Sequence, residues 1–237
     1  MSQEVDQTCQ EQLNHLREEY EEFAYIVSHD LKAPLRAICN LSAWISEDLG
    51  QDIDPEVGHN IQLLQNRAER MERMINAILA FSRVNRLDLE LQEVNVRDLV
   101  EEAAAPFIKS RGLVVHLDQL PTLFTYAKKL ETVITKLLEN AVHFNQSPTP
   151  EVTVSAQEVG DVYKFTVKDN GIGMAQDSLE KIFKLFYTVQ PKDEQESLGA
   201  GLTIVKKIIQ FVGGSIDVDS ATGQGTTFQF TWPKNIQ

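Results

Sequence analysis

The residues best suited to chemistry lie near the start of the chain, in the segment IVSHDLKAPLRAI at positions 26–38. His29 and Asp30 are adjacent there, and Pro34 interrupts what the composition otherwise predicts to be a helix. A neutral imidazole is nucleophilic near pH 7, and a carboxylate bonded to one ring nitrogen would leave the other free to react. We therefore expect His29 to act as a nucleophile beside Asp30, the alternative being a structural histidine on an ordinary helix.

Glycine-rich segments in the second half of the chain could hold a ligand. VKDNGIGM at 167–174 follows a predicted strand, where glycines let the backbone approach a ligand and Asp169 could accept a hydrogen bond from an exocyclic amine. SLGAGLTIVKK at 197–207 opens a helix with glycines, which leaves backbone N–H groups for a phosphate. Taken alone, either segment could equally be a turn or a loop. TGQGTTF at 222–228 is most simply a hairpin turn.

The predicted helix TKLLENAVHFN at 135–145 carries further polar groups among apolar residues. Asn140 could offer an oxygen to Mg²⁺, which takes few protein ligands together with phosphate oxygens and water. The alternative is an amphipathic helix with a solvated polar edge. FKLFYTVQPKDEQES at 183–197 is polar and irregular, which indicates a lid or a disordered loop.

Two long helices are expected to position His29. Residue spacings of three and four predict one amphipathic helix, and GQDIDP at 50–55 ends it before a second helix begins. Because Val27 and Leu31 are expected to face the core, His29 should project into solvent. The predicted stripes comprise Leu13, Leu16, Tyr20, Phe23, Val27, Leu31, Leu35, Ile38, Ser42, Ile45 and Leu49, then Ile61, Leu64, Ala68, Met71, Ile75 and Ile78.

Such a hairpin has one apolar stripe per helix and little else to cover it. Pairing with a second copy into a dimeric four-helix bundle is therefore the expected solution, and a monomeric hairpin packed on the rest of the chain is the alternative. From about residue 92 to residue 237, helical patterns mix with alternating strands and two hairpins, which predicts an α+β two-layer sandwich. We thus expect a helical domain at 1–88 and a second domain at 92–237.

Composition excludes several classes of protein. A formal net charge of −13 over 237 residues argues against a nucleic-acid binder, although it leaves room for a mononucleotide site. Two well-separated cysteines do not suggest a disulfide scaffold or a cysteine metal site. No apolar run approaches the ~18 residues of a membrane span, so we expect a soluble, cytoplasmic chain without a membrane segment.

The order of these pieces closely resembles that of the sensor histidine kinases of two-component signalling. The resemblance rests on SHDLKAPLRAI, the asparagine-bearing helix, DNGIG, FKLF, a lid and GAGL, and it extends from about residue 18 to residue 233. The first segment looks most like that of phytochrome-type and cyanobacterial kinases. The resemblance implies an N-terminal dimerisation and phosphotransfer hairpin and a C-terminal ATP-binding domain of the gyrase and histidine kinase type.

The resemblance also implies a role for each site residue. His29 would be the phosphoacceptor, Asp30 its acid/base neighbour and Asn140 the Mg²⁺ ligand. Asp169 would hold the adenine amine. The remaining implied ATP-binding residues are His143, Gly171, Gly173, Phe183, Phe186, Gly199, Gly201, Leu202 and Thr227. ATP and Mg²⁺ would be the cofactors, and the partners would be a second copy, the receiver domain of a response regulator and an upstream sensor domain.

Four positions depart from the family's pattern. Lys136 stands where a second asparagine is common, while Ser197 and Ala200 replace a glycine and a leucine of the second glycine box. Ala33 stands where kinases that also dephosphorylate their partner carry threonine or asparagine, so phosphatase activity is not expected. Two other functions stay open. One is a dimeric phosphotransfer scaffold with a degenerate ATP domain, and the other is a gyrase-like ATPase in which Glu139 is the catalytic glutamate.

Overall fold

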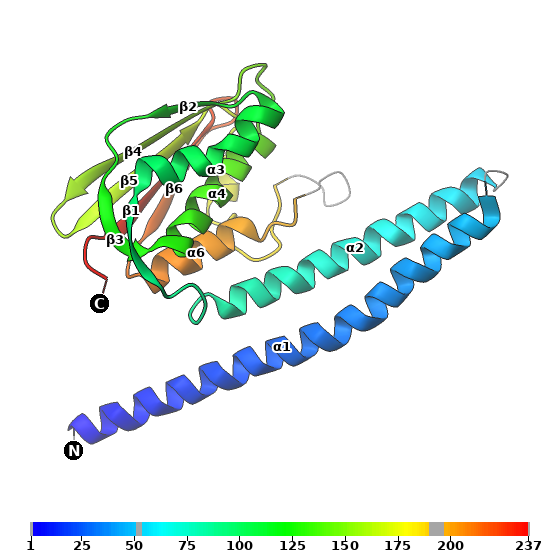
Figure 1. The fold of residues 1–237 in the computed structure, drawn as a ribbon, viewed down its shortest axis with the longest axis horizontal. Helices are drawn as coiled ribbons and strands as arrows, with labels where there is room; N and C mark the ends of the chain where they lie inside the picture. The colour runs from blue at the N-terminus through cyan, green and yellow to red at the C-terminus, as the bar shows by residue number, and fades with distance from the viewer. Residues whose placement is uncertain (1, 51–53, 190–196, 237) are drawn as a thin grey trace. The chain divides into compact units, whose positions relative to one another are not determined.

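The computed structural model describes residues 2–50, 54–189 and 197–236. The chain divides into two compact units, residues 1–83 and residues 84–237. Figure 1 shows the first unit as a helical hairpin and the second as helices packed on a sheet. No helix within the described ranges combines the length and the apolar character that crossing a membrane needs.

The first unit consists of two antiparallel helices, α1 (Ser2–Leu49) and α2 (Pro55–Arg83). Gly50 has a φ of 61°, a left-handed conformation that glycine adopts readily at the end of a helix. The second helix begins at Pro55. Proline has no backbone N–H, and this costs nothing at a helix start because the N–H groups of the first turn have no intrahelical partner. The predicted break therefore falls where the composition placed it, while residues 51–53 lie outside the described part of the chain.

The seam between α1 and α2 is built from small and apolar side chains at seven-residue spacing. The core cluster joins Leu35, Ala68 and Ile75, with Cys39 packed against it. Val27 and Leu31, which were expected to face the core, lie outside this two-helix cluster and are 37% and 47% exposed in the single chain. Helix α1 carries two apolar stripes, and a single partner helix covers only one of them. The buried side chains of the seam are Ala24, Ser28, Leu35, Ser42, Ala68, Ile75 and Ser82.

The second stripe remains exposed along the hairpin. It also repeats about every seven residues, as α1 and α2 would require to pack against further helices. Its members are Leu16, Tyr20, Phe23, Val27, Leu31, Ile38, Leu41, Ile45 and Leu49 on α1, with Val57, Leu64 and Met71 on α2.

The second unit contains two sheets. The smaller sheet pairs two antiparallel strands, β1 and β3, and the larger sheet has the strand order β2-β4-β5-β7-β6. Only β2 and β4 run parallel in the larger sheet. The strands are β1 (Leu91–Asn95), β2 (Val114–Leu117), β3 (Thr122–Tyr126), β4 (Glu151–Val159), β5 (Val162–Asp169), β6 (Ile216–Ser220) and β7 (Thr226–Pro233).

Three helices lie on one face of the larger sheet, as Figure 1 shows for α3, α4 and α6. They are α3 (Val96–Arg111), α4 (Ala127–His143) and α6 (Gly201–Phe211). The unit also contains a short helix, α5 (Gln176–Leu179), that was not expected from the sequence. The Asn95 side chain caps α3 by accepting the N–H of Arg97 at 3.0 Å. The predicted strands, hairpins and longer helices of this unit are confirmed, and with them the α+β two-layer architecture.

The core of the second unit lies between the sheet and these helices. Strand β7 alternates buried and half-buried residues along its whole length, so one face of the strand is packed more fully than the other. Phe165 and Phe230 stack at 4.9 Å between ring centroids. The buried indole of Trp232 donates to the Thr125 hydroxyl at 2.8 Å, which satisfies its one polar atom.

Candidate functional site

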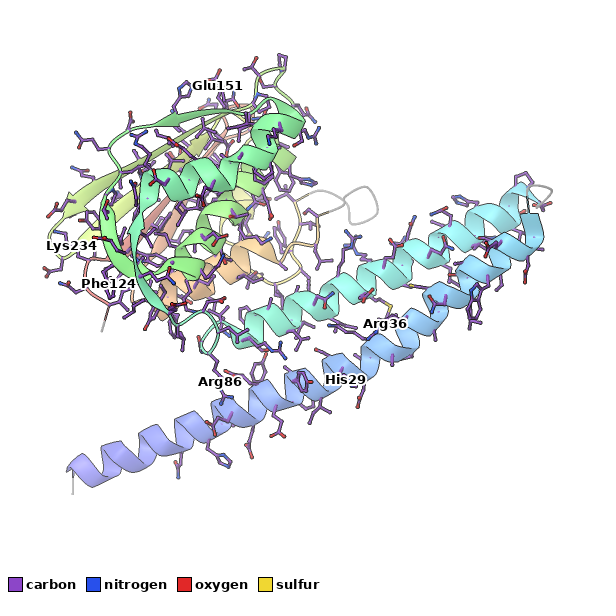
Figure 2. The ribbon with its side chains drawn as sticks, viewed as in Figure 1. His29, Arg36, Arg86, Phe124, Glu151 and Lys234 are labelled. Carbon is purple, nitrogen blue, oxygen red and sulfur yellow. The ribbon has the colours of Figure 1, made fainter. Side chains whose placement is uncertain are left out.

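His29 lies on the exposed surface of α1 (Figure 2). Its side chain is 68% exposed, and Nδ1 lies 3.1 Å from Oδ1 of Asp30, whose side chain is 73% exposed. The adjacent carboxylate therefore reaches the ring although neighbouring helix residues diverge by about 100°. Because this contact engages Nδ1, the ring nitrogen left for an incoming group is Nε2.

One residue beside His29, Tyr25, and a second that contacts Tyr25, Arg83, were not singled out from the sequence. The Tyr25 ring lies one turn before His29, with 6.3 Å between ring centroids and an interplanar angle of 35°. The guanidinium carbon of Arg83, at the end of α2, lies 5.2 Å from the centroid of the Tyr25 ring. The spacing of four between Tyr25 and His29 was visible in the sequence, whereas the approach of Arg83 depends on how the hairpin folds.

Helix α1 continues through Pro34. Proline has no backbone N–H, so the carbonyl of Asp30 lacks its usual partner one turn later. The missing hydrogen bond would let the helix bend beside His29, and such a bend stays a prediction.

Asp169, the last residue of β5, is held by backbone groups from two segments. Its Oδ1 accepts the N–H of Gly171 at 2.8 Å and the N–H of Thr226 at 3.1 Å. Burial raises the pKa of the Asp169 carboxyl above its ordinary value, and these two hydrogen bonds act in the opposite direction. The arrangement leaves Oδ2 outside both bonds, so the carboxylate is fixed in orientation and retains an acceptor.

The threonine that contacts Asp169 is Thr226, which the sequence reasoning missed. Thr227, which the resemblance implied as an ATP-binding residue, pairs with Lys168 across the β5–β7 ladder. Successive side chains of a strand point to opposite faces, so the side chain of Thr227 faces away from that of buried Thr226.

Gly171 and Gly173 are each required by close backbone packing. A Cβ at Gly171 would lie 2.6 Å from the carbonyl oxygen of Phe144, and one at Gly173 would lie 2.0 Å from that of Ala221. Gly173 also has a φ of 65°. Beside them, the N–H of Ile172 donates to the Phe144 carbonyl at 3.0 Å, which ties the loop after β5 to the end of α4.

The polar residues of α4 lie along one edge of that helix. Lys136 Nζ contacts Glu139 Oε2 at 2.7 Å, so this glutamate is already paired with a cation. His143 is exposed, and its ring meets the edge of Phe144 at 4.7 Å between centroids. Asn140 is different, because its Nδ2 is buried and has no hydrogen-bond partner among the described residues. A buried amide group without a partner is costly, which marks Asn140 as a position suited to a ligand.

The start of α6 is held against the segment that contains the two predicted lid phenylalanines. The N–H of Phe186 donates to the carbonyl of Gly199 at 2.8 Å, and both residues have positive φ, 63° and 69°. A Cβ at Gly199 would lie 2.3 Å from the carbonyl oxygen of Tyr187. The Phe183 ring lies 5.1 Å from the Lys206 ammonium of α6. Residues 190–196 of the predicted lid lie outside the described ranges.

Gly201 contrasts with the other glycines. A Cβ there would meet only the Lys136 side chain, at 3.6 Å from Cδ, which is an ordinary van der Waals distance. Packing therefore does not explain this glycine. It is the first residue of α6, where helix N–H groups lack intrahelical partners, and half-buried Leu202 follows it.

The described residues contain no group of three or more histidine, cysteine, aspartate or glutamate side chains that could hold a metal ion alone. Mg²⁺ bound beside a nucleotide has no need of such a cage, because it retains water and takes phosphate oxygens. The ligand from Asn140 would be its Oδ1, because Mg²⁺ takes oxygen ligands, while the partnerless Nδ2 is a donor suited to an acceptor such as a phosphate oxygen.

Two known families match the chain, one in its N-terminal part and one in its C-terminal part. Residues 19–86 match the His Kinase A (phospho-acceptor) domain family. Residues 125–236 match the family described as histidine kinase-, DNA gyrase B-, and HSP90-like ATPase. His29 lies within the first match, and Asn140, Asp169 and Gly201 lie within the second.

Several characterised proteins are similar over nearly the whole chain. Cyanobacterial phytochrome B of Nostoc sp. is 34% identical over 226 residues, which cover 93% of this chain and 30% of that protein. The methanogenesis regulatory histidine kinase FilI of Methanothrix harundinacea is 34% identical over 91% of this chain and 25% of its own length. The chain thus spans less than a third of these two relatives.

The fold is shared with solved histidine kinases. The crystal structure of full-length ShkA in complex with AMPPNP matches with a TM-score of 0.65 and 24% identity, over 91% of this chain and 46% of that one. The Acinetobacter baumannii histidine kinase AdeS matches with a TM-score of 0.62 and 19% identity, over 85% of this chain and 95% of that one. The chain therefore belongs to the sensor histidine kinases and carries the catalytic core of that family.

Proposed function

We propose that the chain is an ATP-dependent protein histidine autokinase that phosphorylates its own His29. The observation that carries the proposal is the exposed imidazole whose Nδ1 is engaged by the adjacent carboxylate at 3.1 Å, inside a phospho-acceptor family match. An exposed ring can meet a bulky nucleotide, and a fixed Nδ1 presents Nε2 as the attacking atom.

The proposed reaction is a phosphoryl transfer from ATP to nitrogen. In the tautomer with its proton on Nδ1, His29 forms a bond from Nε2 to the γ-phosphorus while the bond from that phosphorus to the β–γ bridging oxygen breaks. ADP leaves with the bond's electrons. The Asp30 carboxylate holds the Nδ1 proton as the ring gains positive charge. Transfers of this kind depend mainly on positioning and charge neutralisation.

The proposed ATP site occupies the second unit. Oδ2 of Asp169 would accept the exocyclic amine of adenine, and the N–H groups at the start of α6, near Gly199 and Gly201, would face the phosphates. Mg²⁺ would be held through Asn140 and would neutralise phosphate charge. Exposed His143 could approach the phosphates from α4. Phe183 and Phe186 would anchor the lid, which would exclude water.

Dimerisation through the hairpin is part of the proposal. The exposed stripe of α1 and α2 has the spacing that a four-helix bundle uses, and Leu31, Ile38 and Met71 are 47%, 42% and 51% exposed in one chain. A second copy would cover this stripe. We accordingly assign residues 1–88 to dimerisation and phosphotransfer and residues 92–237 to ATP binding.

The wider role of the protein is also a proposal, because the chain spans only part of its relatives. A cytoplasmic response-regulator receiver domain would take the phosphoryl group from His29 onto an aspartate. Leucine and isoleucine side chains of the helical hairpin would form the surface on which that receiver domain docks. An upstream sensor domain would supply the signal through α1.

Of the two other functions, the gyrase-like ATPase requires a free catalytic glutamate on α4. Glu139 is the candidate, but Lys136 pairs with it at 2.7 Å. Because this carboxylate is engaged by a lysine ammonium, it is not free to orient an attacking water, which argues against this function. The degenerate scaffold differs from the autokinase only in lacking ATP-dependent labelling, so experiment separates them directly.

The test is to incubate the full chain with γ-labelled ATP and Mg²⁺ and to challenge the product with acid and with alkali. The autokinase predicts label that is acid-labile, alkali-stable and absent from His29→Gln. His15→Gln is a matched control, because His15 is an exposed histidine of the same helix that lies 3.6 Å from a carboxylate, that of Glu19. This control should label like the parent.

Each other outcome identifies a different function. Absence of label from a folded parent chain would favour the scaffold. Steady ATP hydrolysis that persists undiminished in His29→Gln would favour the ATPase.

A further inference from the structure

We propose that Tyr25 is a positioning residue for the His29 imidazole and that Arg83 holds Tyr25 in place. The inference rests on the proposed autokinase function, since it concerns how the phospho-acceptor ring is presented. It adds two residues to the site, and one of them comes from the helix opposite His29.

The first observation is the ring contact between Tyr25 and His29. Their centroids lie 6.3 Å apart at an interplanar angle of 35°, within the range over which aromatic pairs attract. His29 is 68% exposed, so its ring has few other contacts to select a rotamer. Asp30 fixes Nδ1, and Tyr25 adds a second contact from one turn earlier in the helix. Two contacts from different directions define the plane of the ring, which one contact alone does not.

The second observation is the cation above the tyrosine. The Arg83 guanidinium lies 5.2 Å from the Tyr25 ring centroid, a cation–π distance. Tyr25 is itself 50% exposed, so a cation held over its ring restrains a side chain that would otherwise move. Arg83 is the last residue of α2, and its contact therefore links the end of one helix to the reactive turn of the other.

Orientation of the nucleophile is what such contacts can contribute to phosphoryl transfer. The attacking nitrogen, the phosphorus and the leaving oxygen must lie roughly in line, and small misplacements of reacting groups lower rates steeply. Tyr25 and Arg83 would act on the maximal rate of transfer. ATP binding would be unaffected, because its proposed residues lie in the second unit. Neither contact uses the tyrosine hydroxyl.

The test compares the maximal rate of His29 labelling, and the ATP concentration that gives half of it, in full-length variants. We expect Tyr25→Leu to lower the maximal rate about ten-fold at an unchanged half-saturating ATP concentration. Tyr25→Phe should restore most of the rate, because it keeps the ring. Arg83→Gln should lower the rate about three-fold. Combined with Tyr25→Leu it should add nothing further, because Arg83 acts through Tyr25.

A spectroscopic readout separates this proposal from the autokinase function itself. In nucleotide-free protein, the ring-proton resonances of His29, identified by their absence from His29→Gln, should shift in Tyr25→Leu as the neighbouring ring current is lost. Trp44→Leu is the control, because it removes a 59% exposed aromatic from the same helix about four turns away. It should change neither the rate nor the His29 resonances.

Three results would overturn the proposal: a Tyr25→Phe rate as low as that of Tyr25→Leu, multiplicative losses in the double variant, or unshifted His29 resonances in Tyr25→Leu. A parent chain that never labels would instead contradict the autokinase function. The resonance shift would still decide whether Tyr25 contacts the ring.

Discussion

The Asp169 carboxylate accepts the backbone N–H of Thr226 at 3.1 Å through Oδ1, the same oxygen that accepts the N–H of Gly171 at 2.8 Å. One oxygen is thus committed to the fold, and the proposed adenine contact falls to the other. An asparagine at this position would keep its own Oδ1 on the same two N–H groups. Its Nδ2 would then face the adenine amine, and two donors would oppose each other.

The first prediction is that Asp169→Asn lowers ATP affinity while raising stability. We expect a loss of at least about 100-fold in affinity, since a hydrogen bond to a charged acceptor is replaced by a mismatch. The pKa of the Asp169 carboxyl is higher in the folded chain than in the unfolded chain. The stability that the protonated carboxyl contributes is therefore fully present below the pKa of the unfolded chain and is lost as pH rises through the pKa of the folded chain. Asp169→Asn should therefore have a larger free energy of unfolding than the parent at neutral pH. Its Tm should be higher by roughly 2–4 °C for each kcal/mol gained.

Titration calorimetry with ATP and scanning calorimetry of the full chain between pH 4 and pH 8 would check both parts. The stability advantage of the variant should shrink as pH falls toward the ordinary pKa of an aspartate. An advantage that is constant over this range, or tight ATP binding by the variant, would contradict the account of Asp169.

The hairpin shows how far the sequence alone predicts a fold. The helices, their break and the exposure of His29 follow from residue types and spacing. Residue types and spacing do not predict which of the two stripes of α1 pairs with α2, because both stripes repeat about every seven residues and both contain large apolar side chains. The inner seam uses Ser28, Leu35 and Ser42, while Leu31 and Ile38 stay outside. That choice depends on how many helices are available to pack.

The second unit shows the same limit at the scale of single residues. Its elements were predicted well because alternation and glycine positions mark strands and turns locally. The contact of Asp169 with Thr226 joins residues 57 positions apart and depends on strand register, since a shift of one residue exchanges the two faces of β7. The approach of Arg83 to Tyr25 is likewise a product of the folded hairpin.

The second prediction contrasts two glycines that were both assigned to the ATP site. Gly201→Ala should keep or slightly raise stability, because its Cβ meets only a lysine methylene at 3.6 Å and alanine favours helices by ~1 kcal/mol. It should nevertheless weaken ATP binding about ten-fold by placing a methyl group where the phosphates approach. Gly173→Ala should destabilise the unit by at least ~1–3 kcal/mol, because of its positive φ and a 2.0 Å clash.

Thermal unfolding and ATP titration of both variants would separate the roles. A large loss of stability in Gly201→Ala would mean that this glycine serves the fold after all. Undiminished ATP binding in that variant would remove Gly201 from the proposed site.

The third prediction concerns the exposed stripe. Met71 is 51% exposed in the single chain, so Met71→Glu should leave the hairpin folded while placing a charge in the proposed dimer core. We expect the dimer dissociation constant to rise at least about 100-fold, measured by sedimentation velocity over a concentration series. Asn76→Glu adds the same charge at an exposed position on another face of α2 and should leave the dimer intact. An unchanged dimer in Met71→Glu would place the interface elsewhere.

The fourth prediction concerns Lys129, a lysine of α4 that is only 3% exposed. Its Nζ donates to the carbonyl oxygen of Val84 and, at 2.9 Å, to that of Leu87. The ammonium also lies 4.5 Å from the centroid of the Phe211 ring. Burial lowers the pKa of Lys129, with the Asp88 carboxylate acting in the opposite direction. One side chain thus fastens the segment that follows α2 to the rest of the second unit.

Lys129→Met should release this segment, since methionine fills similar space but leaves both carbonyls without a donor. We expect cleavage after exposed Arg86 by an arginine-specific protease to become about ten-fold faster, because such cleavage follows the population of the opened segment. Lys128→Met is the matched control, because exposed Lys128 pairs with Glu131 at 2.7 Å and does not hold the segment. Equal cleavage rates in the two variants would show that the segment is held by its apolar contacts, independently of the buried ammonium.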